Sequence, residues 1–260
     1  MQMLHSAPHS ATQSLAGDLA AALDPVIFAS RAGIEPDIWQ ARVLRSPSSR
    51  LLLNCSRQSG KSTVTALLAL HTATYTPGAL VLLLSPSLRQ SAELFRTLAK
   101  LYTATGAVVP PRAESALRLE LANDARVISL PATEATIRGY AGVNLLVIDE
   151  AARVPGDLYS AVRPMLATSG GRLVTLSTPF GSRGWWFDAW RSTEPWERYE
   201  VKATDCPRIP ASFLDEERRN IGAWWFAQEY ECEFLDAESA AFRRVDIDNA
   251  FSDEVETWSL

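Results

Sequence analysis

A run of small and polar residues between an apolar stretch and a helix-forming stretch has the composition of a phosphate site. The segment Ser56-Arg57-Gln58-Ser59-Gly60-Lys61-Ser62-Thr63 follows Leu51-Leu52-Leu53 and leads directly into the apolar stretch from Val64 to Leu70. A loop between a strand and a helix presents free backbone N–H groups and the positive end of the helix dipole to an anion. The order of these features therefore predicts a phosphate-binding loop.

Individual residues of this loop have distinct expected roles. Gly60 lets the backbone approach a phosphate closely, and Lys61 places a positive charge against the outer phosphates. The Ser62 hydroxyl can ligate Mg²⁺. The usual pattern has a glycine where this sequence has Cys55, so the motif is relaxed. An ordinary turn with Lys61 in solvent is the alternative interpretation.

Two adjacent carboxylates, Asp149 and Glu150, end the apolar run Leu145-Leu146-Val147-Ile148. In parallel sheets, ligands bind at the carboxyl ends of the strands. We expect Asp149 to hold Mg²⁺ through water, and Glu150 to orient and deprotonate an attacking water. The alternative is structural, because adjacent acids at a strand end also occur as the N-cap and first-turn residue of a helix.

Three further features have possible functional roles. Gln40 lies upstream of the loop, where helicase-like ATPases place a glutamine that reads adenine; a solvated helix residue is the alternative. Ser177 and Thr178 end another apolar run, and their hydroxyls could sense the γ-phosphate unless they form only a turn. Arg138 stands alone beside Gly139 in a short loop.

The apolar runs and helix-forming stretches alternate along the chain, which predicts an α/β fold with a mostly parallel sheet and helices on both faces. A hairpin and an edge strand are expected in addition. The predicted strands are 51–53, 79–85, 116–121, 126–130, 145–151, 172–179 and 196–203, and the predicted central helices are 64–70 and 88–106.

Helices are also predicted near both ends of the chain. Residues 15–23 and 35–44 should be helical, with a short helix starting at Asp24-Pro25 between them and ending at Gly33. Towards the other end, a charged helix is predicted over 210–220. An aromatic helix over 224–235 should pack back on the sheet.

Composition restricts the class of protein. With 260 residues, 47% hydrophobic and 21% charged, the chain is expected to be globular and soluble. The net charge of −5 argues against a protein that coats nucleic acid everywhere, but allows a local basic groove. Three widely separated cysteines indicate a reducing compartment without a disulfide framework, and the three histidines have no ligand spacing. No apolar run approaches the roughly 18 residues of a membrane span.

The order and spacing of these motifs resemble the large terminase subunit of tailed bacteriophages. The phrases Ile137-Arg138-Gly139-Tyr140, Gly181-Ser182-Arg183-Gly184 and Gln228-Glu229-Tyr230-Glu231-Cys232-Glu233-Phe234 are also similar to that family. The resemblance covers roughly residues 35–242. An Arg-Gln pair in a loop without the leading glycine is itself a terminase-like variant, so the Cys55 departure supports the resemblance.

The resemblance implies a RecA-like, additional-strand (ASCE) P-loop NTPase that uses ATP and Mg²⁺ to drive double-stranded DNA into a procapsid. The implied partners are the portal protein, the small terminase subunit and further copies in a ring, with a monomer in isolation, all in the cytoplasm of a bacterial host. The expected domains are a tail with short helices (1–34), the ATPase (35–236), and a linker or truncated start of a nuclease (237–260). Nuclease activity is therefore expected to be absent.

The resemblance also implies residue roles. Gln40 and residues 56–63 would bind the nucleotide, Ser62 and Asp149 would hold Mg²⁺, Glu150 would be the catalytic base, and Ser177 and Thr178 would form the coupling motif. Arg57 matches a loop arginine that reaches the γ-phosphate in its own subunit. Arg138 matches an arginine that some members present to the neighbouring subunit's ATP; a structural role in its loop is the alternative.

Other classes of protein share part of this pattern. A superfamily 2 helicase needs a second RecA-like core, which the residues after Phe234 do not supply. A non-catalytic, nucleotide-gated DNA adaptor would keep Lys61 but lose the water-activating acid, so Glu150 argues against it. A small-molecule P-loop kinase would normally lack the Ser-Thr-Pro signal together with the Asp-Glu pair.

Overall fold

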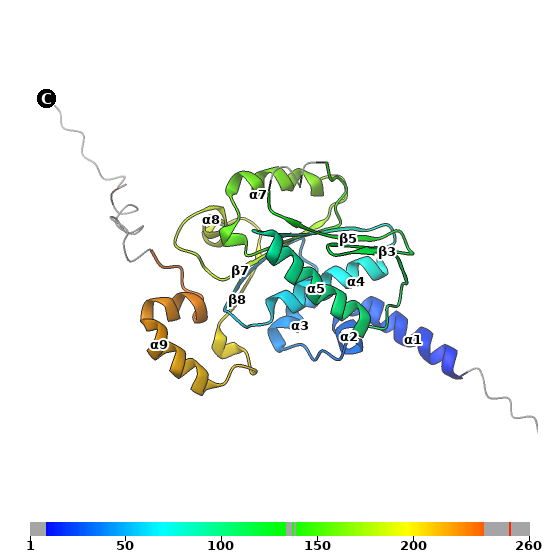
Figure 1. Cartoon of the computed structure of the whole chain (residues 1–260), viewed down its shortest axis with the longest axis horizontal. Helices are drawn as coiled ribbons and strands as arrows, with labels where there is room; N and C mark the ends of the chain where they lie inside the picture. Colours follow the sequence, from blue (N-terminus) through cyan, green and yellow to red (C-terminus); the bar gives the residue numbers. More distant parts are fainter. Residues whose placement is uncertain (1–8, 134–136, 138, 237–249, 251–260) are drawn as a thin grey trace, which may run out of the picture.

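An eight-stranded sheet runs through the centre of the molecule, with helices on both faces (Figure 1). The computed structural model describes residues 9–133, 137, 139–236 and 250. The strand order is β3-β4-β5-β2-β6-β7-β1-β8. Six neighbouring strands are parallel: β5 (Arg126–Pro131), β2 (Leu80–Ser85), β6 (Leu145–Asp149), β7 (Arg172–Ser177), β1 (Arg50–Cys55) and β8 (Glu197–Val201).

Strand β7 lies between the strand that precedes the loop and the strand that carries the carboxylates. Leu176 of β7 pairs with Leu53 of β1 on one side and with Asp149 of β6 on the other. The carboxyl ends of the three strands therefore lie at one edge of the sheet. This inserted strand is the additional strand predicted above, and it confirms the fold class.

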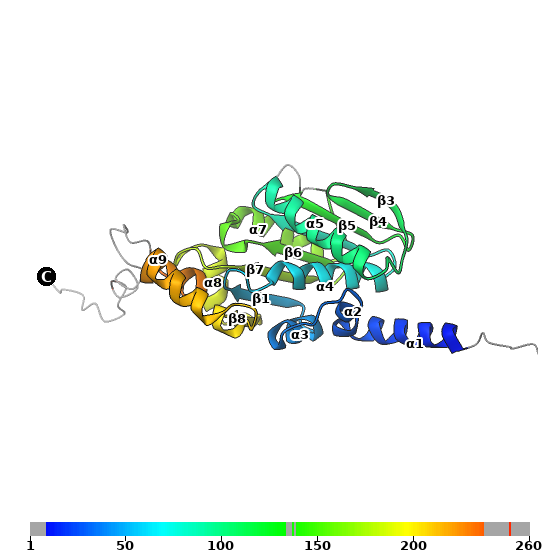
Figure 2. The same cartoon turned by 60° about the horizontal axis from the view of Figure 1, so that its bottom comes forward.

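Consecutive residues of the central strands contribute to opposite faces, as strand geometry requires. Leu51 and Leu53 belong to a core under α2 (Pro25–Arg31), α3 (Ile38–Arg45), α4 (Lys61–Tyr75) and α5 (Leu88–Ala104). Leu52 belongs to a second core under α7 (Gly156–Val162) and α8 (Trp185–Arg191). The two helical layers lie on either side of the sheet in Figure 2. Because both faces are covered, these strands are buried along most of their length and are mainly apolar.

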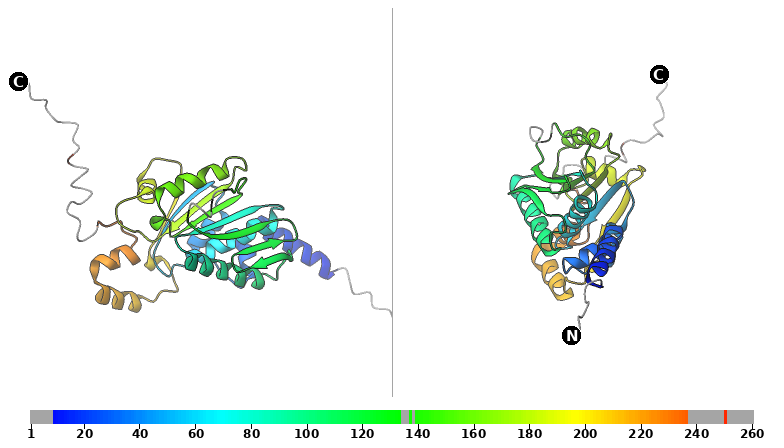
Figure 3. Two further views of the ribbon diagram at one scale, coloured as in Figure 1. Left: turned by 45° about the horizontal axis from the view of Figure 1, so that its top comes forward. Right: turned by 90° about the vertical axis from the view of Figure 1, so that its right-hand side faces the viewer.

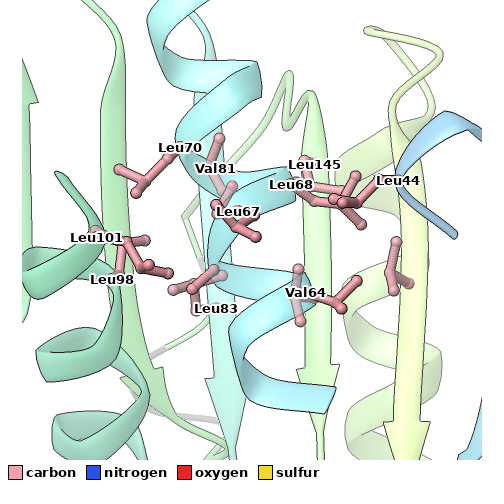
Figure 4. Packing of buried hydrophobic residues seen from close by; sticks show 14 of the residues in the cluster. Leu44, Val64, Leu67, Leu68, Leu70, Val81, Leu83, Leu98, Leu101 and Leu145 are labelled. Carbon is pink, nitrogen blue, oxygen red and sulfur yellow. The ribbon is translucent and has the colours of Figure 1, made fainter. Parts of the chain in front are cut away.

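The larger core is formed mainly between α4, α5 and the sheet. Figure 4 shows Val64, Leu67 and Leu68 of α4 pointing at strand residues such as Val81 and Leu83. The start of α4 is therefore fixed against the strands. That start is the segment whose backbone and side chains would face a phosphate.

The predicted hairpin is present, and it has a third strand that was not predicted. β4 (Arg118–Leu121) and β5 pair antiparallel, with Leu119 opposite Val127. β3 (Pro111–Ser115) pairs antiparallel with β4 at the edge of the sheet. All five residues of β3 are exposed, so this strand has no buried, alternating set of side chains that would reveal it.

The two predicted C-terminal helices form one element, α9 (Ala211–Tyr230), with a sharp kink at Gly222, where φ is 80°. The predicted end at Leu235 was wrong, because the helix stops at Tyr230. The predicted packing on the sheet was also wrong. The helix builds a separate small cluster with η3 (Ala203–Asp205), through Leu214 and Phe226. Figure 3 shows it extending beyond the sheet.

The last turn of α9 and the chain after it return to the main body. Phe234 packs against Trp186 and Phe187 of α8, with ring centroids 5.4 and 5.1 Å away. The Cys232 carbonyl accepts a hydrogen bond of 2.8 Å from the Asn54 side chain at the end of β1. The segment just after α9 is thus fixed beside the loop that follows β1.

Near the N-terminus, α1 (His9–Leu23) starts earlier than predicted, and α2 begins after Asp24 as predicted. The Asp24 carboxylate accepts a hydrogen bond of 2.9 Å from the backbone N–H of Val26, which caps α2. Helix α3 starts at Ile38, later than expected. Among the described residues, no helix combines the length and apolar character needed to cross a membrane. The segment expected to be a linker, 237–260, lies outside the described residues except for residue 250.

Candidate nucleotide-binding site

The loop between β1 and α4 has a backbone that requires glycine at one point. Gly60 caps α4 with φ of 89°, in the left-handed region. A Cβ atom at this position would lie 2.7 Å from Nε2 of Gln40. The Ser59 hydroxyl donates a hydrogen bond of 2.9 Å to the Ser56 carbonyl and tightens the loop. The local fold therefore has the strand, turn and helix start that a phosphate-binding loop needs.

The Lys61 side chain joins the three strand ends. Its ammonium lies 3.1 Å from Glu150 Oε1 and donates a hydrogen bond of 2.9 Å to Thr178 Oγ1. The structure thus brings together the loop lysine, the second carboxylate and one of the two predicted coupling hydroxyls. Lys61 is largely buried, which excludes the interpretation of an ordinary turn with the lysine in solvent.

Asp149 is a buried carboxylate at the end of β6. Its Oδ1 accepts a hydrogen bond of 3.0 Å from the Glu150 backbone N–H. Burial and the neighbouring Glu150 charge raise the pKa of Asp149 to about 6, although Lys61 opposes the shift. A cation beside this carboxylate would offset the cost of burying its charge.

Mg²⁺ is usually bound by one or two carboxylates together with waters and substrate phosphates. The described residues contain no group of three or more His, Cys, Asp or Glu side chains that could hold a metal alone. The Asp149 carboxylate and the Ser62 hydroxyl in the first turn of α4 are the oxygen donors that Mg²⁺ prefers, and phosphate oxygens would complete such a site. Helix α4 begins at Lys61, before the predicted start at Val64, so Ser62 and Thr63 lie in its first turn. The Thr63 N–H donates a hydrogen bond of 3.1 Å to the Gly60 carbonyl.

Glu150 has a strained backbone. Its φ of 50° and ψ of 43° are in the left-handed region, and it caps the short helix η1 (Ala151–Arg153). Residues other than glycine adopt this conformation at a cost of about 1–3 kcal/mol and are concentrated at functional sites. The carboxylate lies between two cations, Lys61 and Arg153, with Arg153 Nε 3.9 Å from Oε2. Arg153 was not predicted, although its place three residues after Glu150 is a signal that sequence reasoning could have used.

The two predicted coupling residues have different environments. The Thr178 hydroxyl faces the Lys61 ammonium. The Ser177 hydroxyl instead donates a hydrogen bond of 2.8 Å to the backbone carbonyl of Thr178. Of the pair, Thr178 is therefore the residue whose side chain would meet a phosphate.

Arg57 contacts the end of α9. Its Nε donates a hydrogen bond to the Glu229 carboxylate, and its Nη2 lies 3.4 Å from Glu229 Oε1. Its backbone N–H donates a hydrogen bond of 3.0 Å to the Glu229 carbonyl. The hydrogen bond to Glu229 raises the pKa of Arg57. Glu229 is 8% exposed and was missed as a site residue. The exposed Gln58 follows Arg57 with φ of 59°.

Gln40 is buried against the loop. Its Oε1 accepts a hydrogen bond of 2.9 Å from the Asp37 N–H, and its Nε2 lies 3.5 Å from the Ser59 carbonyl. Burial excludes the alternative of a solvated helix residue. Arg208 lies on the same side of the loop and bonds to the Ser59 carbonyl at 3.0 Å and to Asp37 Oδ1 at 2.8 Å. No motif in the sequence indicated Arg208.

Arg138, the predicted arginine for the neighbouring subunit's ATP, lies outside the described residues. The remaining predicted residues of the nucleotide site lie around the loop and the ends of β6 and β7. Ser56 is buried at the start of the loop, where its backbone N–H donates a hydrogen bond of 2.9 Å to the Val201 carbonyl of β8.

Comparisons with known proteins agree with this architecture. The large terminase subunit of Thermus virus P23-45 is 24% identical over 261 residues, covering 85% of this chain and 53% of that protein. The large terminase subunit of Escherichia phage T5 is 27% identical, covering 80% of this chain and 49% of that protein. The chain therefore spans about half the length of the curated relatives it matches.

Solved structures show the same fold. The large terminase ATPase domain of Thermus phage P74-26 superposes with a TM-score of 0.71 at 24% identity, covering 80% of this chain and 97% of that domain. The large terminase of another thermophilic bacteriophage, solved in complex with ADP, superposes with a TM-score of 0.66 at 12% identity, covering 76% of this chain and 53% of that protein.

A family model matches most of the chain and confirms the resemblance inferred from the motifs. It describes the N-terminal part of the large terminase subunit of T4-like-virus type and covers residues 52–249. The matched region includes the loop, both carboxylates, the Ser-Thr-Pro turn and α9. This chain belongs to the large terminase subunit family.

Proposed function

We propose that this chain is an ATP-hydrolysing motor domain that moves double-stranded DNA into a procapsid. The observation that supports this best is the position of the Lys61 ammonium, which joins the phosphate loop to Glu150 and Thr178. A lysine at this point would contact the phosphates of ATP, the proposed base Glu150 and the Thr178 hydroxyl. That hydroxyl could change its hydrogen bond when a phosphate binds or leaves. ADP and ATP-γ-S complexes of the large terminase from a thermophilic bacteriophage support the choice of nucleotide.

In the proposed reaction, the loop binds the phosphates and Lys61 turns its charge towards them. Losing this partner leaves the Glu150 carboxylate available to accept a proton from the attacking water. Asp149 and Ser62 would hold Mg²⁺, which would neutralise charge on the outer phosphates when bound. Gln40, packed against the loop, would lie on the side of the nucleotide that carries the adenine.

Arg57 is proposed to stabilise the γ-phosphate from within the same subunit. In this structure its guanidinium bonds to Glu229, so it would have to exchange that carboxylate for a phosphate. Arginine is suited to both partners, because its planar fork binds carboxylates and phosphates alike. Arg138 would act on the ATP of a neighbouring subunit.

The partners are proposed from family membership. They are duplex DNA, the portal protein, the small terminase subunit and further copies of this chain in a ring on the portal, within the host cytoplasm. The net charge of −5 suggests that the isolated chain binds duplex DNA weakly and in a salt-sensitive way. A local cluster of basic residues in the assembled ring would supply most of the affinity.

A direct test measures phosphate release from ATP by the purified chain, with Mg²⁺ present or chelated. We expect slow, Mg²⁺-dependent hydrolysis in the parent. Glu150→Gln should still bind a fluorescent ATP analogue but should turn over at least ~10²-fold more slowly, the scale of a lost general base. Equal turnover by parent and Glu150→Gln would remove Glu150 from the mechanism.

A further inference from the structure

Arg153 contacts two parts of the site that are separate in the sequence. Its Nε lies 3.9 Å from Glu150 Oε2, and its Cζ lies 4.1 Å from the centre of the Phe180 ring. Glu150 follows β6 and is the proposed base, whereas Phe180 follows β7 and the Ser-Thr-Pro turn. One guanidinium therefore lies between the base and the segment expected to respond to hydrolysis.

The two cations beside Glu150 would respond differently to ATP. Lys61 belongs to the phosphate loop, so phosphates would attract its ammonium away from the carboxylate. Arg153 belongs to η1, outside that loop. Once Lys61 has moved, Arg153 is the cation that still lies against Glu150 among the ion pairs of the described residues.

At 3.9 Å, the contact between Arg153 and Glu150 is an ion pair that is too long for a hydrogen bond. A small rotation of the guanidinium would close this distance. The same rotation would change the contact with Phe180, because a cation is attracted to the face of an aromatic ring. Phe180 is 39% exposed, so protein atoms cover only part of its ring.

A second contact ties the same two segments together. The Trp185 indole N–H donates a hydrogen bond of 2.8 Å to the Val154 carbonyl, which directly follows Arg153. The Trp185 ring also stacks on Tyr159 of α7, with centroids 3.9 Å apart and planes 5° apart. The segment from Phe180 to Trp185 therefore contacts η1 at its first residue and the residue after η1 at its last.

We propose that Arg153 is a positioning residue for the catalytic base, and that it links the state of Glu150 to the segment after β7 through Phe180. It holds the Glu150 carboxylate in place after Lys61 has moved to the phosphates. This inference rests on the ATP hydrolysis proposed above.

The test measures kcat, KM and ATP-analogue affinity for the whole chain and its variants. A misplaced reacting group can cost on the order of 100-fold in rate. Arg153→Ala removes only one of the contacts that place Glu150, so we expect kcat to fall by part of that factor, about tenfold. Its affinity for the ATP analogue should stay within about twofold of the parent, because the phosphate ligands are unchanged. Arg153→Lys should restore most of the kcat by keeping the charge.

The link to Phe180 is tested by a double-mutant cycle. Phe180→Leu should lower kcat about threefold, and the double variant Arg153→Ala with Phe180→Leu should be no slower than Arg153→Ala alone. Additive losses would show that the two residues act independently and would overturn the link.

Arg218 gives a matched control. It also lies over a phenylalanine, with Cζ 4.2 Å from the centre of the Phe226 ring, and pairs with a glutamate, Glu231, at 2.5 Å. Arg218→Ala removes contacts of the same kinds without changing a partner of Glu150 or Phe180, and it should leave kcat unchanged. Equal losses for Arg218→Ala and Arg153→Ala would reduce the effect to general destabilisation and overturn the proposal.

The outcomes separate this inference from the proposed function. If the parent does not hydrolyse ATP, the proposed function fails first. If the parent hydrolyses ATP and Arg153→Ala matches its kcat, the positioning role alone is overturned. If circular dichroism shows that Arg153→Ala does not fold, Phe180→Leu and Arg153→Lys decide. A lowered kcat in Phe180→Leu with unchanged affinity for the ATP analogue supports the link to Phe180. Parental kinetics in both variants overturn it.

Discussion

Lys61 and Thr178 are 117 residues apart in the sequence, and the Lys61 ammonium donates a hydrogen bond of 2.9 Å to the Thr178 hydroxyl. This contact exists because β7 is inserted between β1 and β6. In that order, whatever follows β7 lies between the phosphate loop and the carboxylates. A residue at this point can respond to the lysine, the base and the nucleotide together.

Gly60→Ala should weaken nucleotide binding, because it adds a Cβ 2.7 Å from the buried Gln40 amide at a φ of 89°. The amide would have to shift, and the loop would open with it. Gly78→Ala is the matched control. Gly78 also has a positive φ, of 72°, but nothing lies within 4 Å of an added Cβ.

Both variants carry the backbone strain of about 1–3 kcal/mol that a left-handed alanine costs. Only Gly60→Ala should also lose affinity in a fluorescent-nucleotide titration, by at least about tenfold. Equal affinities in the two variants would show that Gly60 serves the backbone conformation alone.

Arg57→Ala should destabilise the chain, because it leaves the Glu229 carboxylate buried without its guanidinium partner. Arg57 itself is more than half exposed, so solvent screening limits the expected loss to about 1 kcal/mol in the free energy of unfolding. Arg57→Ala combined with Glu229→Gln should recover part of it, because the charge is then gone. Arg96→Ala, at an exposed pair with Glu93, should cost less in urea unfolding.

The ion pair of Arg57 and Glu229 illustrates what the sequence could not predict. Nothing in the loop motif indicates a partner for Arg57 that lies on α9. Glu229 reaches the loop only because the chain after α9 returns to the end of β1, where Asn54 binds the Cys232 carbonyl. Arg208 was missed for the same reason, since its partners Asp37 and Ser59 are distant in sequence.

The predictable parts had local signals. Residues 80–84 are apolar without interruption because both faces of β2 are buried, and that pattern is visible in the sequence. Gly60-Lys61 marks the start of a helix after a strand, and Asp149 marks the end of a second strand. The exposed strand β3 and the true end of α9 had no such signal, because their limits depend on tertiary contacts.

Stability at mildly acidic pH should depend on His71. Its ring is largely buried beside Phe28 and Tyr75, and Nε2 bonds to the Ala21 carbonyl at 3.1 Å, joining α4 to α1. Burial lowers the pKa of His71 below its ordinary value of 6.5. Between the lowered pKa and 6.5 the unfolded chain therefore binds more protons, so the free energy of unfolding should fall as pH drops through about 6.5.

The measurement compares urea unfolding of the parent and His71→Gln on either side of that ordinary pKa. Glutamine can still donate a hydrogen bond to Ala21 but does not titrate, so the variant should lose less stability as the pH is lowered. The raised pKa of Asp149 has the opposite effect on the pH dependence of the free energy of unfolding. Because the parent and the variant both keep Asp149, the difference between their pH profiles reports on His71. Parallel pH profiles would exclude a role for His71.

Thr178→Ala should separate nucleotide binding from movement of DNA. The variant removes the hydroxyl that Lys61 contacts, while the loop charge, Asp149 and Ser62 are unchanged. Affinity for an ATP analogue should therefore stay within about twofold of the parent. Translocation in a reconstituted packaging assay should fall by at least about tenfold, because the end of β7 no longer exchanges a hydrogen bond when the phosphate arrives or leaves.

Two further variants identify the atom responsible. Thr178→Ser keeps a hydroxyl and should package DNA close to the parental rate. Ser177→Ala removes a hydroxyl that bonds to the Thr178 carbonyl rather than to Lys61, so it should impair packaging less than Thr178→Ala does. If Thr178→Ala packages DNA at the parental rate, the Ser-Thr-Pro turn is structural. The link between phosphate loss and movement would then run through η1, where Arg153 contacts Phe180.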